Sequence, residues 1–139
     1  MMSEESTTPD LMELVRLIFE AADRADWDQI LKFHAPDAVW ESPDLGTFEG
    51  VAAIRDLWED YESSYDDVRI EAVEILDYSN GIVLCVNPHT ARPWGSGQPV
   101  RRRVAFVYTW VEGLVRRLSE YADIDEGRAA AERLARERG

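Results

Sequence analysis

The amino-acid sequence predicts an α+β fold, in which antiparallel strands gather in one sheet and the helices are segregated from them. Over the first 64 residues, apolar side chains recur mainly at helical spacing. From residue 68 onward they alternate with polar ones, as they do in strands. Turn sequences at residues 79–81 (Ser-Asn-Gly) and 112–113 (Glu-Gly) separate the alternating stretches, and Asn-Gly is typical of tight hairpins.

The chain should form one domain over residues 8–139, preceded by a polar, disordered segment at residues 1–7. Thr8 and Pro9 have the order of a helix N-cap followed by proline at the first helical position. From there, apolar residues at intervals of three and four predict an amphipathic helix that ends near Asp23.

A second, short helix is expected to begin at the capping residue Asp26 and to carry His34 on its apolar stripe. This helix should end before Pro36, because the residue that precedes a proline avoids helical backbone angles. A short strand over residues 38–42 and a loop over residues 43–50 are expected to follow.

The rest of the chain should form a third helix, four strands and a last helix. Their expected ranges are 51–64 for the third helix, 68–75, 82–92, 100–111 and 114–123 for the strands, and 126–138 for the last helix. The alternation slips at Val73, which predicts a bulge, and Pro88 argues for a sheet edge or a bulge. Asp125 is the expected cap of the last helix, while Asp123 is assigned a capping or loop role.

Composition limits the classes of function. The 139 residues are 45% hydrophobic and 31% charged, which describes one soluble domain. Residues 1–77 carry 5 basic and 21 acidic side chains and residues 78–139 carry 10 and 7, for a net charge of −13. So acidic a chain is a poor partner for nucleic acid or an anionic membrane, and we see neither a signal peptide nor a membrane-spanning run.

The few cysteine and histidine residues limit the chemistry further. Cys85 is the single cysteine, which fits a reducing compartment, and we expect a cytoplasmic protein in which this thiol is buried and inert. His34 and His89 lie on different elements without a regular ligand spacing, so no metal site is expected.

The two faces of the long strand at residues 100–111 differ in size. Phe106 and Tyr108 share one face and are large enough to form a cavity wall, whereas Ala105 and Val107 on the other suit a flat surface. Both faces are largely apolar, so we expect helices to cover the first and a second copy of the chain to cover the other. This predicts a homodimer formed through the convex face of the sheet.

Four polar side chains should converge on the concave face. If the turn between the last two strands has three residues, Glu120 lies opposite Val104. Through the preceding hairpin, His89 lies opposite Arg102 and Asn87 opposite Val104. A base and an acid with separated pKa values are what water activation or proton shuttling requires, so Glu120 is the candidate base and His89 the acid or its partner. Arg102 and Asn87 would orient the substrate, or the cluster could serve structure alone.

The element order, together with several short motifs, resembles the nuclear transport factor 2-like superfamily, and within it the branch of SnoaL-like polyketide cyclases and limonene epoxide hydrolases. The motifs are Ala25-Asp26-Trp27-Asp28, Phe33-His34-Ala35-Pro36-Asp37-Ala38-Val39-Trp40, Phe48-Glu49-Gly50, Ser79-Asn80-Gly81, Glu112-Gly113 and Glu120-Tyr121-Ala122-Asp123. The resemblance implies a curved sheet wrapped on three N-terminal helices into a cone, with a pocket inside. It implies less about activity, because this fold hosts isomerases, hydrolases, cyclases and binding modules.

The resemblance to limonene epoxide hydrolases implies roles for individual positions. Glu120 takes the place of the aspartate base, His89 that of the second aspartate and Asn87 that of the arginine. Glu41 stands where an asparagine helps to hold the attacking water, and Val39 where a tyrosine would do so. One carboxylate is thus retained conservatively, while the Asp-Arg-Asp arrangement as such does not carry over.

We therefore expect a protein that binds a small hydrophobic, polyketide- or terpenoid-like molecule in a mostly apolar pocket of ~300–1,000 Å³. The chemistry would be cofactor-free hydrolysis, cyclisation or isomerisation. The expected pocket walls, beside the polar cluster and Glu41, are Tyr108, Phe106, Trp58, Tyr61 and Leu118. The alternative is a non-catalytic ligand-binding or dimeric interaction module of the same fold.

Overall fold

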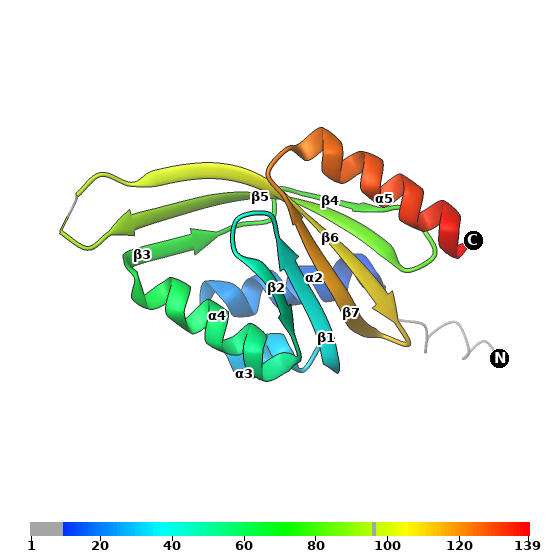
Figure 1. Ribbon diagram of the computed structural model, residues 1–139, viewed down its shortest axis with the longest axis horizontal. Helices are drawn as coiled ribbons and strands as arrows, with labels where there is room; N and C mark the ends of the chain where they lie inside the picture. The colour runs from blue at the N-terminus through cyan, green and yellow to red at the C-terminus, as the bar shows by residue number, and fades with distance from the viewer. Residues whose placement is uncertain (1–9, 96) are drawn as a thin grey trace.

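The computed structural model describes residues 10–95 and 97–139 of the chain (Figure 1). In chain order, the helices and strands are α2 (Leu11–Asp23), α3 (Trp27–Leu31), β1 (His34–Ser42), β2 (Gly46–Glu49), α4 (Val51–Ser63), β3 (Tyr65–Ile70), β4 (Glu74–Asp77), β5 (Ile82–Pro93), β6 (Val100–Val111), β7 (Leu114–Tyr121) and α5 (Ile124–Arg138). Among the described residues, no helix is long and apolar enough to span a membrane.

All these strands belong to one curled sheet. Its order is β2-β1-β7-β6-β5-β3, with β4 alongside β5. β1 and β7 run parallel, whereas the other strand pairs are antiparallel. Helices α2, α3 and α4 lie against one side of the sheet, the inner face, and α5 packs on the opposite, outer face (Figure 1). The predicted α+β fold, a curved mixed sheet wrapped on three N-terminal helices with a C-terminal helix, is confirmed.

Acidic side chains begin the first two helices. The Asp26 carboxylate accepts a hydrogen bond from the backbone N–H of Gln29 at 3.2 Å, so it caps α3 as predicted. Helix α2 begins at Leu11, and Asp10 is its cap. Thr8 and Pro9, which we expected to begin this helix, lie outside the described residues, as does the segment 1–7 predicted to be disordered.

The last helix begins earlier than the sequence predicts. Asp123 is the N-cap of α5, because its carboxylate accepts hydrogen bonds from the backbone N–H groups of Asp125 and Glu126. The prediction that Asp125 is the cap is therefore wrong, and the capping role considered for Asp123 is confirmed.

The segment after α3 also differs from the prediction. The helix ends at Leu31, and His34 is the first residue of β1 rather than a member of the helix. The physical reason is that this segment pairs with β7, because the backbone N–H of Val115 donates a hydrogen bond to the Phe33 carbonyl at 2.7 Å. Pro36 lies in the irregular part of the β1–β7 pairing, where a missing N–H is tolerated.

The expected loop at residues 43–50 contains a strand. β2 pairs with β1 across a tight turn, in which the Ser42 hydroxyl accepts hydrogen bonds from the backbone N–H groups of Asp44 and Leu45. This turn places Asp44 and Leu45 beside the inner face, where they border the site described below.

The interruption of the strand pattern predicted at Val73 is observed, since β3 ends at Ile70 and β4 begins at Glu74. β5 pairs with β4 up to Val86 and with β3 from His89 onward. Pro88 lies at this change of partner, and its carbonyl accepts from the backbone N–H of Glu71 at 3.1 Å. β5 is an interior strand, so the edge considered for Pro88 is wrong. β5 keeps its register with β6 through Pro88, which pairs with Arg103, and the irregularity lies in the facing segment between β3 and β4.

The β6–β7 hairpin corrects the predicted register. Val111 pairs with Leu114, so the turn has two residues rather than three, and Glu112 and Gly113 both have positive φ, at 52° and 80°. A register shift between Thr109 and Trp110 moves the pairing by one further residue. Glu120 therefore lies opposite Phe106 rather than Val104. Because the two shifts add to two residues, Glu120 stays on the predicted face.

The β5–β6 pairing follows the prediction. His89 lies opposite Arg102, and Asn87 lies opposite Val104. These pairs alternate with outer-face residues along both strands, so His89, Arg102 and Asn87 all belong to the inner face.

Each face of the sheet has its own hydrophobic cluster. The inner cluster contains the large rings Trp40, Phe106 and Tyr108. The outer cluster lies beneath α5 and includes Ala105 and Val107, the small residues that we expected a second copy of the chain to cover. α5 of the same chain covers them instead, so this part of the convex face is not available to a partner.

Candidate functional site

A groove opens between α4, the β1–β2 turn and β6. Its volume is about 340 Å³, and we call it the entrance groove. It is lined by Ser42, Asp44, Leu45, Leu57, Asp60, Tyr61, Ser64, Tyr65, Arg102 and Glu120. Directly beneath it lies a narrow cavity of about 30 Å³, which shares with the groove the walls Leu45, Leu57, Tyr61, Arg102 and Glu120. The two spaces are therefore contiguous, and Glu120 lies where they meet.

Glu120 is the buried carboxylate of this site. Its side chain is 5% exposed, and Arg102 Nη2 donates to Glu120 Oε2 at 2.8 Å. The same Nη2 atom lies 3.5 Å from Asp44 Oδ2. Burial raises the pKa of the Glu120 carboxyl, while the Arg102 guanidinium lowers it and the charge of Asp44 raises it further, with a net shift upward. Glu120 is thus a more basic carboxylate than one in water.

His89 lies in the narrow cavity beside Glu120 and Arg102. It is 5% exposed and packs edge-on against Phe106, with 5.7 Å between ring centroids. Burial, and secondly the positive charge of Arg102, lower the pKa of His89 to about 4. Its Nε2 atom is buried and has no hydrogen-bond partner among the described residues. His89 is therefore a neutral imidazole near pH 7.

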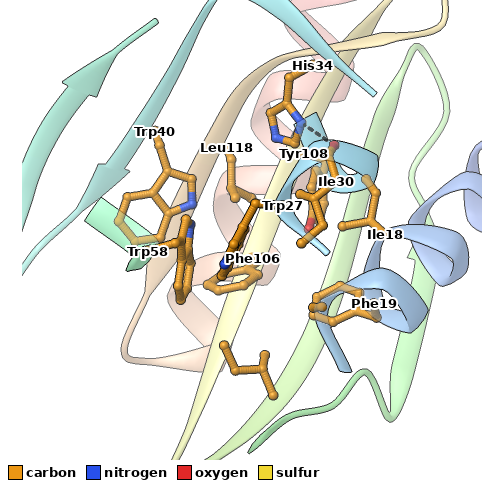
Figure 2. A pocket seen from close by; sticks show the side chains of 12 residues that line it. Ile18, Phe19, Trp27, Ile30, His34, Trp40, Trp58, Phe106, Tyr108 and Leu118 are labelled. Atoms are coloured by element: carbon orange, nitrogen blue, oxygen red, sulfur yellow. Dashed lines mark hydrogen bonds between the residues drawn. The ribbon is translucent and has the colours of Figure 1, made fainter. Parts of the chain in front are cut away.

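A third space, the aromatic cavity, lies deeper among the helices and measures about 40 Å³ (Figure 2). Its walls are Ile18, Phe19, Ala22, Trp27, Ile30, His34, Trp40, Trp58, Ile70, Phe106, Tyr108 and Leu118. Trp40 and Trp58 border both this cavity and the narrow one. Their rings pack edge to face at 5.4 Å and 72°, so together they separate the two spaces.

His34 lies at one end of the aromatic cavity (Figure 2). Its Nδ1 lies 3.0 Å from the Ile30 carbonyl oxygen, which can only accept a hydrogen bond, so Nδ1 carries the proton. Burial lowers the pKa of His34, against the opposing effect of this hydrogen bond. The ring is thus neutral near pH 7, with Nε2 as its acceptor.

Each of the expected wall residues borders at least one of the three spaces. Tyr61 borders the groove and the narrow cavity, while Phe106, Tyr108 and Leu118 border the aromatic cavity and Trp58 borders both cavities. Sequence reasoning missed Trp40, Trp27 and Phe19 as wall residues. Trp40 had a signal, because its alternation with Ala38 along β1 places both on the inner face.

Two expected site residues lie elsewhere. Glu41 is on the opposite face of β1 from Trp40, where it accepts from the Ser119 hydroxyl at 2.8 Å and pairs with Arg117. Asn87 is on the inner face but borders none of the three spaces, and its Nδ2 donates to the Glu71 carbonyl at 2.7 Å across the β3–β4 break. Glu41 and Glu120 both line a separate hollow of about 530 Å³, whereas Asn87 does not join Glu120 and instead stabilises the bent part of the sheet.

The three spaces differ greatly in size. The two cavities hold a few atoms each, since a single water requires roughly 10–15 Å³. The entrance groove reaches the size of common ligand pockets, ~300–1,000 Å³, and so do two other surface hollows, of about 380 and 530 Å³. A ligand of drug-like size that approaches Glu120 through this groove would lie mainly in the groove and present only one end to the narrow cavity.

Metal-binding and thiol chemistry find little support in this region. Within residues 10–95 and 97–139, no group of three His, Cys, Asp or Glu side chains is placed to hold a metal ion. Cys85 is fully buried in β5, and burial raises the pKa of its thiol, so it stays protonated near pH 7.

Comparison with known proteins gives one family and many structural neighbours. The model of the SnoaL-like domain family matches residues 15–118. Among curated proteins, none matches the sequence. A crystal structure from Sinorhizobium meliloti, called a polyketide cyclase, is 25% identical, with a TM-score of 0.66 over 86% of this chain and 99% of that one.

Two further neighbours were solved with ligands. TerC co-crystallised with polyporic acid is 17% identical, with a TM-score of 0.72 over 87% of this chain and 97% of that one. A protein with a ketosteroid isomerase-like fold from Catenulispora acidiphila, in complex with trimethylamine, is 16% identical, with a TM-score of 0.71 over 83% of this chain and 86% of that one. At these identities the likeness establishes the fold alone.

Proposed function

Because the chain belongs to the SnoaL-like domain family, we propose that it binds a small, largely apolar organic molecule in the entrance groove and performs cofactor-free acid–base chemistry on it. Hydrolysis, cyclisation and isomerisation are the reaction types within this proposal. One observation carries it: Glu120, a nearly buried carboxylate, lies at the floor of the groove between a guanidinium and a neutral imidazole. Neighbours called polyketide cyclases support the reaction class.

The proposed base is the Glu120 carboxylate. It would take a proton from a substrate C–H group or from water, and become a neutral carboxylic acid. Burial makes it a better proton acceptor, because the charged form is poorly solvated there. The bond to Arg102 holds the carboxylate in one orientation toward the groove.

His89 would act as a neutral ring rather than as an imidazolium. With a pKa of about 4, it is deprotonated near pH 7 and can offer one N–H or one lone pair to a substrate oxygen. Its unpartnered Nε2 supports such a contact, because buried polar atoms are normally hydrogen-bonded.

The test is Glu120→Gln, which keeps the shape and removes the base. Glu41→Gln is the matched control, since Glu41 lies on a neighbouring strand but on the other face. Both variants and the wild type would be incubated with a panel of small polyketide, terpenoid and epoxide compounds, and product formation followed by mass spectrometry. We expect Glu120→Gln to lower turnover at least 100-fold and Glu41→Gln to leave it within about twofold. Equal turnover by Glu120→Gln and wild type would refute the assignment.

A second function, ligand binding without turnover, is favoured by the 2.8 Å Arg102–Glu120 pair. An ion pair stabilises the carboxylate and opposes its protonation. In that case Glu120→Gln would leave ligand affinity nearly unchanged, and the wild type would convert no compound that it binds.

A homodimer in a reducing, cytoplasmic compartment remains part of this proposal. With α5 over Ala105 and Val107, the partner would have to use the outer face of β1, β2 and β7. Sedimentation velocity at micromolar concentration distinguishes a dimer from a monomer of 15.9 kDa.

A further inference from the structure

The entrance groove has an excess of negative charge. Its walls carry three carboxylates, Asp44, Asp60 and Glu120, but a single cationic side chain, Arg102. Arg102 makes its short contact with Glu120, at 2.8 Å, and a longer one with Asp44, at 3.5 Å. One guanidinium therefore faces three carboxylates in the same hollow.

Asp60 is the carboxylate with least compensation. It lies on α4, it is exposed, and it has no ion pair with any residue that the structure describes. Within residues 10–95 and 97–139, its backbone carbonyl accepts hydrogen bonds from the hydroxyls of Ser63 and Ser64 and from the backbone N–H of Ser64. Its charge is thus directed at solvent and at whatever occupies the groove.

Aromatic side chains border the same space. Tyr61 and Tyr65 both line the groove, and their ring centroids are 5.2 Å apart. The face of a tyrosine ring attracts a cation, because the ring quadrupole is negative above its plane. Carboxylates together with tyrosine rings make a surface that favours a poorly hydrated cation over an anion or a neutral molecule.

The floor of the groove adds an independent sign of a ligand. His89 is 95% buried within the narrow cavity, and its Nε2 lacks a hydrogen-bond partner among the described residues. A ligand in the groove can present a hydroxyl or carbonyl group to this ring. The narrow cavity beneath the groove therefore offers a polar contact, and the groove carries negative charge at its rim.

We propose that the ligand of the entrance groove is an organic cation, such as an amine or a quaternary ammonium compound, whose charged group lies between Asp44, Asp60 and the two tyrosines. This inference rests on the proposed function and specifies its substrate class. The apolar part or a hydroxyl group of the molecule then points down toward Glu120 and His89.

A matched pair of probes tests the charge alone. Choline and 3,3-dimethylbutan-1-ol have nearly the same shape, but only choline is charged. Binding of each would be followed by amide chemical-shift changes in the full-length protein, at 20 and 300 mM NaCl. We expect choline to bind at least fivefold more tightly at 20 mM, to shift the signals of Asp60, Tyr61 and Tyr65, and to lose most of this advantage at 300 mM.

The variant Asp60→Asn locates the effect. It should weaken choline binding about three- to fivefold and leave 3,3-dimethylbutan-1-ol unchanged. Glu132→Gln is the matched control, because Glu132 is an exposed carboxylate on α5 at the opposite side of the sheet. It removes the same net charge and should change choline affinity by less than about 1.5-fold.

Equal affinity for the two probes, or no choline binding at 50 mM, would overturn the cation assignment. So would an equal loss of affinity in Asp60→Asn and Glu132→Gln, because the attraction would then come from net charge alone. None of these results touches the role of Glu120, which the turnover of Glu120→Gln tests separately.

Discussion

The two faces of the sheet are packed in different ways. On the inner face, the rings of Trp40, Trp58 and Phe106 meet edge to face, at 5.4 and 6.3 Å between centroids. The cavities of 40 and 30 Å³ lie among them. On the outer face, α5 presses small and aliphatic side chains onto β5 and β6. Flat rings leave gaps that branched aliphatic chains fill, so the inner face can hold a site and the outer face supplies close packing.

Polar groups follow the same division. The buried side-chain nitrogen and oxygen atoms without a partner among the described residues belong to Trp40, Asn87, His89 and Trp110, which are all on the inner face. An unpaired buried polar atom destabilises a fold, so such atoms are expected where function requires them. The unpaired polar atoms thus lie on the face that holds the cavities, and the close packing lies beneath α5.

The largest expected effect comes from truncating one buried leucine on each face of the sheet and comparing the loss in the free energy of unfolding. Leu84 is fully buried beneath α5, whereas Leu118 already borders the aromatic cavity. We expect Leu84→Ala to lower the free energy of unfolding by about 2–5 kcal/mol. Leu118→Ala should cost about 1 kcal/mol less, because its side chain has fewer atoms packed around it, and it should enlarge the cavity. Urea unfolding measures both values, and an equal loss in the two variants would contradict the comparison.

Lowering the pH should destabilise the folded protein, because the buried His89 binds a proton more weakly than it does in the unfolded chain. Its pKa is about 4 in the folded protein and near 6.5 when unfolded, so between these values the unfolded state binds the additional proton. The stabilising contribution is complete above pH 6.5 and is lost as the pH falls toward 4, to a total of about 3 kcal/mol.

The variant His89→Phe removes this titration. The difference in unfolding free energy between His89→Phe and the wild type should therefore change with pH between 7 and 4, in favour of the variant at low pH. Urea unfolding at several pH values measures it. His34→Phe serves as the comparison, because burial lowers the pKa of His34 in the same direction at a different place. A difference that is constant with pH would show that His89 titrates normally.

The closeness of α5 to the sheet rests on Gly127. A Cβ atom added there would lie 2.8 Å from the Ala105 Cβ and 3.4 Å from the Tyr121 Cβ. Gly127→Val should therefore cost about 1–3 kcal/mol through overpacking. Ala129→Val, on the exposed side of the same helix, should cost only about 0.5 kcal/mol, from helix propensity. Thermal unfolding of the two variants sharpens the estimate of how tightly the outer face is packed.

The smallest expected effect is that Glu120→Gln and Glu41→Gln change the free energy of unfolding in opposite directions. Burial raises the pKa of Glu120, so the folded state disfavours its charged form, and Glu120→Gln should be neutral or stabilising by less than about 1 kcal/mol at pH 7. Burial alone would raise the pKa of Glu41 as well, but Ser119 and Arg117 outweigh it and lower the pKa. Glu41→Gln should thus destabilise by less than about 1 kcal/mol. Denaturation at pH 7 compares them, and a loss in Glu120→Gln larger than in Glu41→Gln would reverse the interpretation.

The fold was largely predictable because local signals and packing agree. Helical periodicity located α2 and α4, alternation located β6 at residues 100–111, and the turn sequence at residues 79–81 located the connection between β4 and β5. The predictions failed at element ends. β1 began at His34 and β2 formed within an expected loop, because pairing with neighbouring strands outweighed local preference.

The site was predictable only in part. Glu120 reached the expected face although both the turn length and the bulge were unforeseen, since two shifts of one residue restore the side of the strand. Glu41 did not, because strand alternation places it away from Trp40. The covering of Ala105 and Val107 by α5 could not be anticipated either, because an apolar face does not specify what packs against it.

By itself, the sequence determined the element order, the two-faced strands and the candidate residues Glu120, His89 and Arg102, since these depend on periodicity and turn chemistry along the chain. Tertiary structure alone decided that His89 is neutral, that the spaces beneath the helices are narrow and that the groove is rimmed by Asp44 and Asp60. Burial, cavity volume and charge balance are properties of side chains brought together from distant segments, and no local pattern encodes them.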